Sequence, residues 1–316
     1  MRQPLSIYAR MASINIAIRN FTDFQKRANR KIGKVIRKYT HFSKGRTTAN
    51  KLRPKISIDE VESALDELEI SRGDRLIVHS GISNIGKVEG GPAGIVNRLR
   101  ERVSGSGIVL FPTFPFETTM QRYLESSPSF DVMASVSKMG AVTDVALKSA
   151  EGMRSIHPTH PVTGFGDDAK SYLEDHHRDE TPFGPSSPFW RLADSGGKIL
   201  VLGVGLKNVT EVHLPEDRLG EKFPVKVYID KRYEVPCRDW NGVELTLITR
   251  CHDPRISRIR DNNLMEDAFL SEGIYRKIDL GNHSIGVIDF KQMDRYLQDA
   301  ALSQRFTIYG KIWGHL

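Results

Sequence analysis

Short apolar runs flanked by glycine recur along the chain, and they limit the folds that it can adopt. Such runs lie at residues 76–78 and 108–111 and within residues 198–202, where four apolar residues follow Lys198. Runs this short with so few polar residues are typical of strands that are buried on both faces of a sheet. Apolar residues at helical spacing from about Pro92 to Val103 complete a strand-helix-strand unit between the first two runs. The pattern predicts a mixed α/β domain, with a mixed sheet sandwiched by helices.

The first helix of this domain is predicted from Ser57 to about Glu69. Ser57 is a residue type that caps helices, and Asp59 and Glu60 place negative charge in the first turn. Two later strands are expected near residues 226–229 and 244–249. The folded domain is therefore predicted to span residues 57–316.

Residues 1–56 differ sharply from the rest of the chain in charge. They contain 15 Lys and Arg and one acidic residue, whereas the remainder contains 31 basic and 38 acidic residues. Apolar residues recur at helical spacing between Ile14 and Tyr39, which predicts a basic amphipathic helix followed by a linker over residues 40–56. Such a helix could contact a membrane surface through residues 1–40, serve as an organellar targeting segment, or pack against another subunit of a homo-oligomer.

Charge and cysteine content narrow the classes of function. The body of the chain offers no basic face and no recognisable motif for nucleic acid, so a nucleic-acid partner is not expected. The two cysteines, Cys237 and Cys251, are too few for a disulfide framework, which favours a reducing compartment. No stretch reaches the roughly 20 apolar residues that span a bilayer. A cytoplasmic protein is expected, with peripheral contact at the inner membrane face as a further option.

Three polar blocks accompany the predicted strands. They are residues 79–91 (HSGISNIGKVEGG), residues 154–161 (RSIHPTHP), and a segment from Ser187 to Glu216 that ends in TEVHLPE. Together and in this order, they resemble the aminoglycoside 3-N-acetyltransferase family over residues 57 to about 290. The chain departs from the residues common in that family, which are Ser, Ser and Ala, at Gly81, Pro161 and Pro215.

The resemblance implies the α/β fold of that family and an acyltransferase that moves an acetyl group from acetyl-CoA to a sugar amine. A strand that leads through a small polar loop to a helix can hold phosphate oxygens with backbone N–H groups and hydroxyls. An ordinary strand-to-helix turn is the alternative for that block. The candidate residues for binding coenzyme A are His79, Ser80, Ser83, Gly86, Thr113, Arg154, Ser155 and His157.

His213 matches the histidine that is the catalytic base in the family. Acetyl transfer from a thioester mainly requires an amine to be deprotonated, and the pKa of histidine lies near the working pH. A carboxylate beside the ring would fix its tautomer and stabilise the imidazolium that forms. Asp253 is the first choice for this carboxylate and Glu216 the second, although Glu216 could instead bind an ammonium group of the acceptor.

Two other chemistries are alternatives to direct transfer. His157, His160, His176 and His177 could ligate a metal, but the helical HExxH motif is absent, so no metal is predicted. Nothing in the sequence marks Cys251 as an activated thiolate, which disfavours an acetyl-cysteine intermediate.

Two classes of acceptor are compatible with the sequence. The basic N-terminal segment favours an amino sugar of surface-glycan or sugar-nucleotide biosynthesis, because such an enzyme would gain from a position near the membrane. An aminoglycoside antibiotic is the alternative, because the acidic body would attract a polycation. A non-catalytic member of the fold that binds a glycan or a membrane is the alternative from another class.

Overall fold

The computed structural model describes residues 53–310. The chain divides into two units, Met1–Arg53 and Pro54–Leu316, and every element described below belongs to the second unit. The amphipathic helix predicted between Ile14 and Tyr39 lies outside the described residues. Within residues 53–310, no helix combines the length and apolar character needed to cross a membrane.

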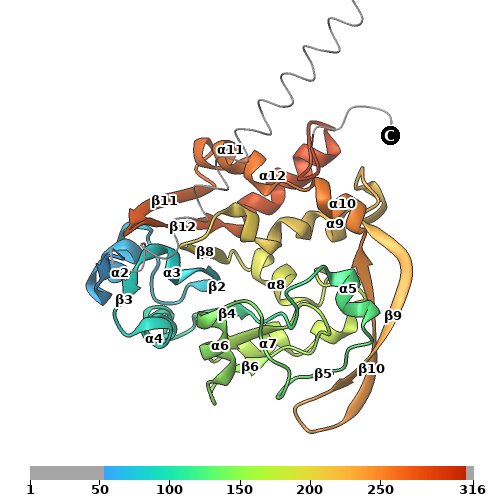
Figure 1. Cartoon of the computed structure of the whole chain (residues 1–316). Helices are drawn as coiled ribbons and strands as arrows, with labels where there is room; N and C mark the ends of the chain where they lie inside the picture. Colours follow the sequence, from blue (N-terminus) through green and yellow to red (C-terminus); the bar gives the residue numbers. More distant parts are fainter. Residues whose placement is uncertain (1–52, 311–316) are drawn as a thin grey trace, which may run out of the picture. The chain divides into compact units, whose positions relative to one another are not determined.

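A seven-stranded sheet forms the centre of this unit, in the order β11-β12-β8-β2-β4-β7-β6 (Figure 1). The three strands at its middle, β8, β2 and β4, are parallel to one another, and the outer pairings are antiparallel. The prediction of a mixed α/β domain is confirmed. The strands are β2 (Arg75–Ser80), β4 (Ile108–Pro112), β6 (Met153–Arg154), β7 (Val162–Phe165), β8 (Lys198–Leu202), β11 (Tyr275–Leu280) and β12 (His283–Asp289).

Helices cover both faces of this sheet, which explains why its central strands are continuously apolar. On β8, Leu200 and Leu202 face the core that contains residues of α2, α4 and α6. Ile199 and Val201 face the opposite core, to which α7, α8, α9, α11 and α12 contribute. The helices of the first face are α2 (Ile58–Glu67), α4 (Gly91–Val103) and α6 (Ala141–Lys148). Those of the second face are α7 (Ala169–Leu173), α8 (Pro188–Asp194), α9 (Leu214–Leu219), α11 (Glu266–Ser271) and α12 (Phe290–Leu302).

Helix α2 begins as the sequence predicts. The Ser57 side chain accepts a hydrogen bond from the backbone N–H of Glu60, and the Glu60 side chain accepts one from the backbone of Ser57. This reciprocal arrangement satisfies two backbone donors that the first helical turn leaves free.

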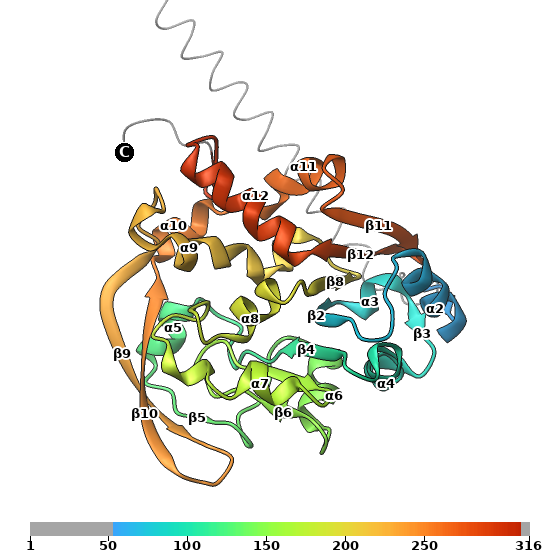
Figure 2. The same ribbon diagram turned by 180° about the vertical axis from the view of Figure 1, so that it is seen from behind.

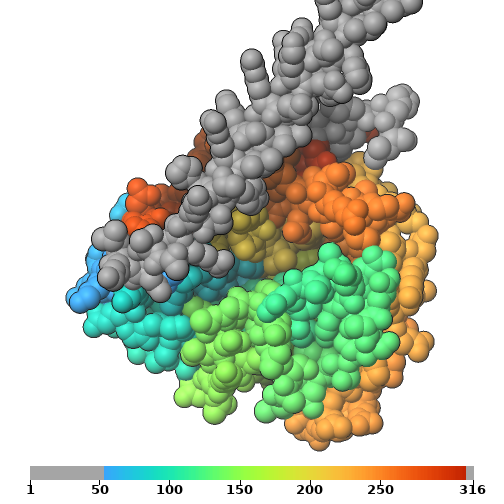
Figure 3. Space-filling model, viewed as in Figure 1, coloured from blue at the N-terminus to red at the C-terminus, as the bar shows by residue number. Residues whose placement is uncertain are grey.

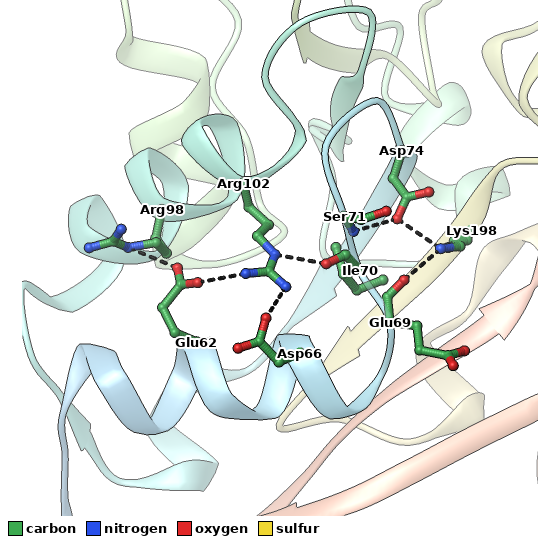
Figure 4. A network of polar contacts seen from close by, with 9 residues as sticks. All are labelled: Glu62, Asp66, Glu69, Ile70, Ser71, Asp74, Arg98, Arg102 and Lys198. Atoms are coloured by element: carbon green, nitrogen blue, oxygen red, sulfur yellow. Dashed lines mark hydrogen bonds and ion pairs between the residues drawn. The ribbon is translucent and has the colours of Figure 1, made fainter.

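A network of ionic and polar contacts holds α2, α4 and the loop before β2 together (Figure 4). Arg102 on α4 pairs with Glu62 on α2 at 3.1 Å and donates to the backbone carbonyl of Ile70 at 2.7 Å. Lys198 at the start of β8 binds the Asp74 carboxylate at 2.8 Å. The network therefore fixes the loop from which the central strand β2 emerges.

The two later strands that the sequence predicts belong to a separate, three-stranded sheet. Strands β9 (Tyr228–Arg238) and β10 (Glu244–His252) make an antiparallel hairpin, and the short strand β5 (Phe130–Asp131) pairs with β9 in parallel. The hairpin runs along one side of the unit in both ribbon views (Figures 1 and 2). Strand β10 ends at His252, so this second sheet carries the chain to the candidate site.

Candidate active site

The carboxyl ends of β2 and β8, which are neighbours in the sheet, turn away from each other through glycines. Gly203 after β8 has a φ of +69°, and a Cβ atom there would come within 2.6 Å of the carbonyl oxygen of Gly81 after β2. The side chain of Asn84 donates to the carbonyl of Gly203 at 2.7 Å and ties the two turns together. Sites in α/β proteins commonly form at this edge of a sheet, where adjacent connections part.

A cavity of about 190 Å³ lies at these strand ends. His79 and Ser80 of β2 line it together with Thr210, Phe114 and Thr143, from segments far apart in the sequence. The hydroxyl of Thr210 is buried and has no hydrogen-bond partner among the described residues. Such a hydroxyl could bind a polar ligand atom. In Figure 3 the segment around residue 200 (yellow) is recessed between the segments drawn in green and orange.

Two candidates for cofactor binding in the first block lie on or after the short helix α3 (Ile82–Ile85). Ser83 is exposed on this helix, whereas Gly86 is buried. A Cβ atom at Gly86 would come within 2.4 Å of the carbonyl oxygen of Pro54. The close approach of two backbone segments therefore accounts for Gly86 without a ligand.

His79 takes part in a buried hydrogen bond that the sequence did not predict. Its Nε2 atom lies 2.8 and 3.0 Å from the two carboxylate oxygens of Glu211, which is fully buried. Glu211 thereby fixes the ring of His79 at the edge of the cavity.

The candidate phosphate ligand Arg154 is enclosed by protein groups. Its guanidinium donates to the side chain and the backbone carbonyl of Thr113 and to the carbonyl of Ser135. It also lies over the ring of Phe130, 4.9 Å from the ring centre. Burial lowers the pKa of Arg154 to about 10. These contacts give Arg154 and Thr113 a structural role, because binding a phosphate would require breaking them.

Ser155 and His157 belong to a buried group of histidines. The Ser155 hydroxyl hydrogen bonds to Nδ1 of His176 at 2.9 Å, and Nε2 of His176 donates to the carbonyl of Pro182 at 3.0 Å. Nδ1 of His157 accepts from the backbone N–H of His160 at 3.0 Å. Burial lowers the pKa of His157 and His160 well below the ordinary histidine value, and that of His176 to about 3. All three rings are therefore neutral at physiological pH.

His213 and Glu216 meet because they are three residues apart on consecutive helical turns. His213 ends a 3₁₀ turn, η4 (Thr210–His213), and Glu216 lies in the first turn of α9. Nδ1 of His213 lies 2.8 Å from Oε1 of Glu216, and both side chains are buried. An ionised carboxylate only accepts hydrogen bonds, so the ring proton lies on Nδ1 and Nε2 carries a free electron pair.

Three further side chains surround this pair. His252, at the end of β10, donates from Nε2 to Glu216 at 2.8 Å. Tyr309 donates its hydroxyl proton to the other oxygen of Glu216 at 2.6 Å. Arg260 donates from Nη1 to Nε2 of His213 at 2.6 Å. The sequence analysis did not assign His252, Arg260 or Tyr309 to the site.

The charge state of the pair follows from burial and these contacts. Burial lowers the pKa of His213, and the Glu216 charge offsets this only in part. Burial alone would raise the pKa of Glu216, but the interactions with His213 and His252 hold it below the ordinary value. His213 is thus a neutral base beside an ionised carboxylate.

Asp253, the first choice for the carboxylate beside His213, lies in a different contact. It caps helix α10 (Pro254–Ile259) by accepting from the backbone N–H of Arg255, and it also binds the Arg255 guanidinium at 2.6 Å. Glu216 makes the hydrogen bond that the sequence assigned first to Asp253. The i,i+3 spacing of His213 and Glu216 was the signal that could have reversed this ranking.

Other chemistries can be compared with the same geometry. His213, Glu216 and His252 bring three ligand atoms within 4.8 Å of one another, which a metal ion could use. A metal on Nδ1 of His213 would displace the proton that Glu216 accepts. Cys237 and Cys251 are buried, and burial raises the pKa of each thiol to about 12, so neither is an activated nucleophile.

The family model for aminoglycoside 3-N-acetyltransferases matches residues 77–300. The chain belongs to this family. The resemblance drawn from the three sequence blocks is therefore confirmed, and the chain is an acetyl-CoA-dependent acyltransferase of the aminoglycoside 3-N-acetyltransferase type.

Curated relatives share this membership at modest identity. The aminoglycoside N(3)-acetyltransferase III of Salmonella sp is 27% identical over 262 residues, which cover 76% of this chain and 86% of that protein. The aminoglycoside N(3)-acetyltransferase VIII of Streptomyces fradiae is 30% identical over 175 residues, covering 50% of this chain and 61% of that protein.

Solved structures of the family have the same fold. The AAC-IIIb structure, a binary complex with CoASH, is 22% identical and superposes with a TM-score of 0.64 over 79% of this chain and 96% of that one. AAC-VIa bound to sisomicin is 22% identical, with a TM-score of 0.60 over 78% of this chain and 99% of that one.

Proposed function

We propose that this acetyltransferase moves the acetyl group of acetyl-CoA directly to an amino group of an amino sugar, with His213 as the general base. One observation carries the proposal. Nδ1 of His213 is hydrogen-bonded to buried Glu216 at 2.8 Å, which leaves Nε2 as a proton acceptor.

The proposed step requires only proton transfer and alignment from the protein. As the amine nitrogen bonds to the acetyl carbon, Nε2 of His213 accepts the amine proton, and Glu216 stabilises the imidazolium that forms. The carbon–sulfur bond then breaks, and the thiolate of coenzyme A takes up that proton from the imidazolium, which restores neutral His213. Both cysteines lie outside this step, because their thiols are buried and resist ionisation.

The strand-end cavity supports a place for coenzyme A. His79, Ser80 and the unpartnered hydroxyl of Thr210 offer polar atoms there. A ligand arm that enters this cavity would meet these groups. Among the solved relatives, AAC-IIIb is described in complex with CoASH, which supports the same cosubstrate.

For the acceptor we favour an amino sugar of glycan or sugar-nucleotide biosynthesis over an aminoglycoside. One observation favours the alternative. Glu216, Asp217 and Glu221 contribute to a second pocket, of about 610 Å³, where they would attract a cationic sugar. Lys226 and Arg250 line the same pocket and oppose that attraction.

A screen with acetyl-CoA tests both the reaction and the base. Release of the coenzyme A thiol is followed with amino sugars, amino-sugar nucleotides and aminoglycosides. On the best acceptor, His213→Gln should lower kcat by about 10²- to 10⁴-fold, the usual worth of a general base, with acetyl-CoA affinity unchanged. A variant that keeps kcat within a few-fold of the parent would refute the role of His213. Absence of thiol release with every acceptor would favour the non-catalytic alternative.

A further inference from the structure

Arg260 occupies the position that an acceptor amine must take. Its Nη1 atom lies 2.6 Å from Nε2 of His213. A guanidinium can only donate hydrogen bonds, so Arg260 uses the electron pair that would accept the amine proton. An amine that is to be deprotonated must itself lie within about 2.6–3.2 Å of Nε2. Arg260 and the acceptor amine therefore cannot occupy the site together.

The backbone around Arg260 is anchored, whereas its side chain is held weakly. Asp253 caps α10 on one side, and the N–H of Asp261 donates to the carbonyl of Ile308 at 2.9 Å on the other. Arg260 itself is exposed. Within residues 53–310 its side chain makes one hydrogen bond, to the neutral ring of His213, and no ion pair with a carboxylate. The guanidinium can therefore leave His213 without any change of the backbone.

The positive charge of Arg260 determines which acceptors can displace its guanidinium from His213. An acceptor with further ammonium groups next to the reacting amine would bring like charges together. A phosphate or carboxylate close to the reacting amine would instead give the guanidinium a planar, charge-assisted partner, which arginine binds well. Movement of Arg260 onto such a group would free Nε2 of His213 at the moment when the amine arrives.

We propose that Arg260 selects acceptors that carry an anionic group near the amine that is acetylated. This inference rests on the proposed transfer to an amino sugar and specifies the class of sugar. The same side chain that covers the base in the free enzyme becomes the ligand of the acceptor's anion, and Arg260 is a specificity-determining residue for the reaction.

Matched acceptors test the selection. The value of kcat/KM is measured for 2-amino-2-deoxyglucose, its 1-phosphate, its 6-phosphate, its uridine diphosphate derivative, and sisomicin as a polycation without an anionic group. We expect at least one phosphate-bearing sugar to exceed the neutral sugar by about 10- to 100-fold, the worth of one charge-assisted hydrogen bond. Arg260→Gln should reduce this ratio about tenfold or more. Arg258→Gln, which removes a neighbouring exposed arginine, should leave the ratio within twofold of the parent.

Two results would overturn the proposal. One is a ratio that is the same in Arg260→Gln and the parent, and the other is a parent enzyme that prefers sisomicin to every phosphate-bearing sugar.

A binding measurement, which needs no turnover, separates the role of Arg260 from the proposed reaction. Calorimetry with coenzyme A present should show weaker binding of the phosphate sugars by Arg260→Gln than by the parent. Equal binding would refute the role of Arg260, whereas a failure of all acceptors to react would refute only the transfer reaction.

Discussion

The carboxylate of Glu216 accepts hydrogen bonds from three side chains that belong to three separate segments. His213 precedes it by three residues, His252 comes from the second sheet, and Tyr309 comes from the segment after α12. Burial raises the pKa of the Tyr309 phenol, so Tyr309 remains a donor at any working pH. The orientation of the His213 ring is therefore fixed through Glu216 and not through Asp253, whose carboxylate binds Arg255.

This geometry predicts different effects for two carboxylate-to-amide changes. Glu216→Gln places an amide that can donate against Nδ1 of His213, which favours the wrong tautomer, so kcat should fall by about 10³- to 10⁴-fold. Asp253→Asn keeps a side chain that can cap α10, so kcat should fall less than about tenfold. Steady-state kinetics of both variants, with circular dichroism as a check on folding, decides between them. The opposite order would restore Asp253 as the partner of the base.

At the scale of the elements, ion pairs and a hydrogen bond to the backbone join α2 to α4. Arg102 is largely buried between Glu62 and Asp66, and it also satisfies the backbone carbonyl of Ile70 (Figure 4). Arg98 pairs with the same Glu62 from a more exposed position.

We predict that Arg102→Met lowers the free energy of unfolding by about 1–3 kcal/mol, because the Ile70 carbonyl and Glu62 lose a partner in a partly buried place. Arg98→Met, the matched control, should cost less than about 1 kcal/mol, as expected of an exposed ion pair. Urea unfolding measures both. Equal effects for the two variants would mean that the Ile70 contact adds nothing to stability.

The elements also show which parts of the fold can be predicted from sequence. The strand at residues 198–202 was predicted to the residue, because Gly197 and Gly203 bound a segment that is apolar from Ile199 to Leu202. Two separate strands were expected near residues 226–229 and 244–249, yet β9 extends to Arg238 and pairs with β10 as a hairpin in a second sheet. Local apolar pattern identifies a strand but does not choose the sheet that it joins.

The contacts of the candidate site likewise fall into those that sequence spacing can predict and those that it cannot. His213 and Glu216 are neighbours on a helical turn, so spacing alone could pair them. Arg260 follows the second sheet and Tyr309 follows α12, and they contact His213 and Glu216. Glu211, from the segment after β8, contacts His79 on the neighbouring strand β2. Those contacts exist only once the whole unit is folded, so the sequence could not predict them, whereas the ranking of Asp253 over Glu216 overlooked a spacing that the sequence already shows.

At the scale of the whole molecule, the buried histidines make stability depend on pH. His157, His160 and His176 have folded-state pKa values below the ordinary value of about 6.5 because of burial. Below pH 6.5 the unfolded chain therefore binds protons that the folded chain excludes, and the free energy of unfolding falls as the pH falls. Each histidine contributes a slope of about 1.4 kcal/mol per pH unit until its folded-state pKa is reached.

Thermal unfolding at pH 8, 6 and 5 should thus show a steep loss of stability below pH 6. His176→Gln, whose amide can still bond to Ser155 and the Pro182 carbonyl, should reduce the slope of stability against pH by about one histidine's share. An unchanged slope in this variant would show that His176 is protonated in the folded protein.

The role of the basic N-terminal segment can be tested by deletion. Deletion of residues 1–50 should leave acetylation of a small acceptor largely unchanged, because these residues precede the family match at residues 77–300. The deletion should weaken sedimentation with anionic vesicles, because 15 basic residues within positions 1–56 attract such a surface. Vesicle binding that is equal in both forms would favour packing against a partner subunit.

The burial of both cysteines has a practical consequence for measuring this enzyme. Cys237 and Cys251 are the protein's two thiols, and with pKa values of about 12 they are almost wholly protonated at neutral pH. Disulfide reagents react with thiolates. The cysteines of the folded protein should therefore react very slowly with a chromogenic disulfide, whereas the thiol of each released coenzyme A reacts rapidly. Colour would then report turnover continuously without a protein background, and a slow additional rise of two equivalents per chain would report unfolding.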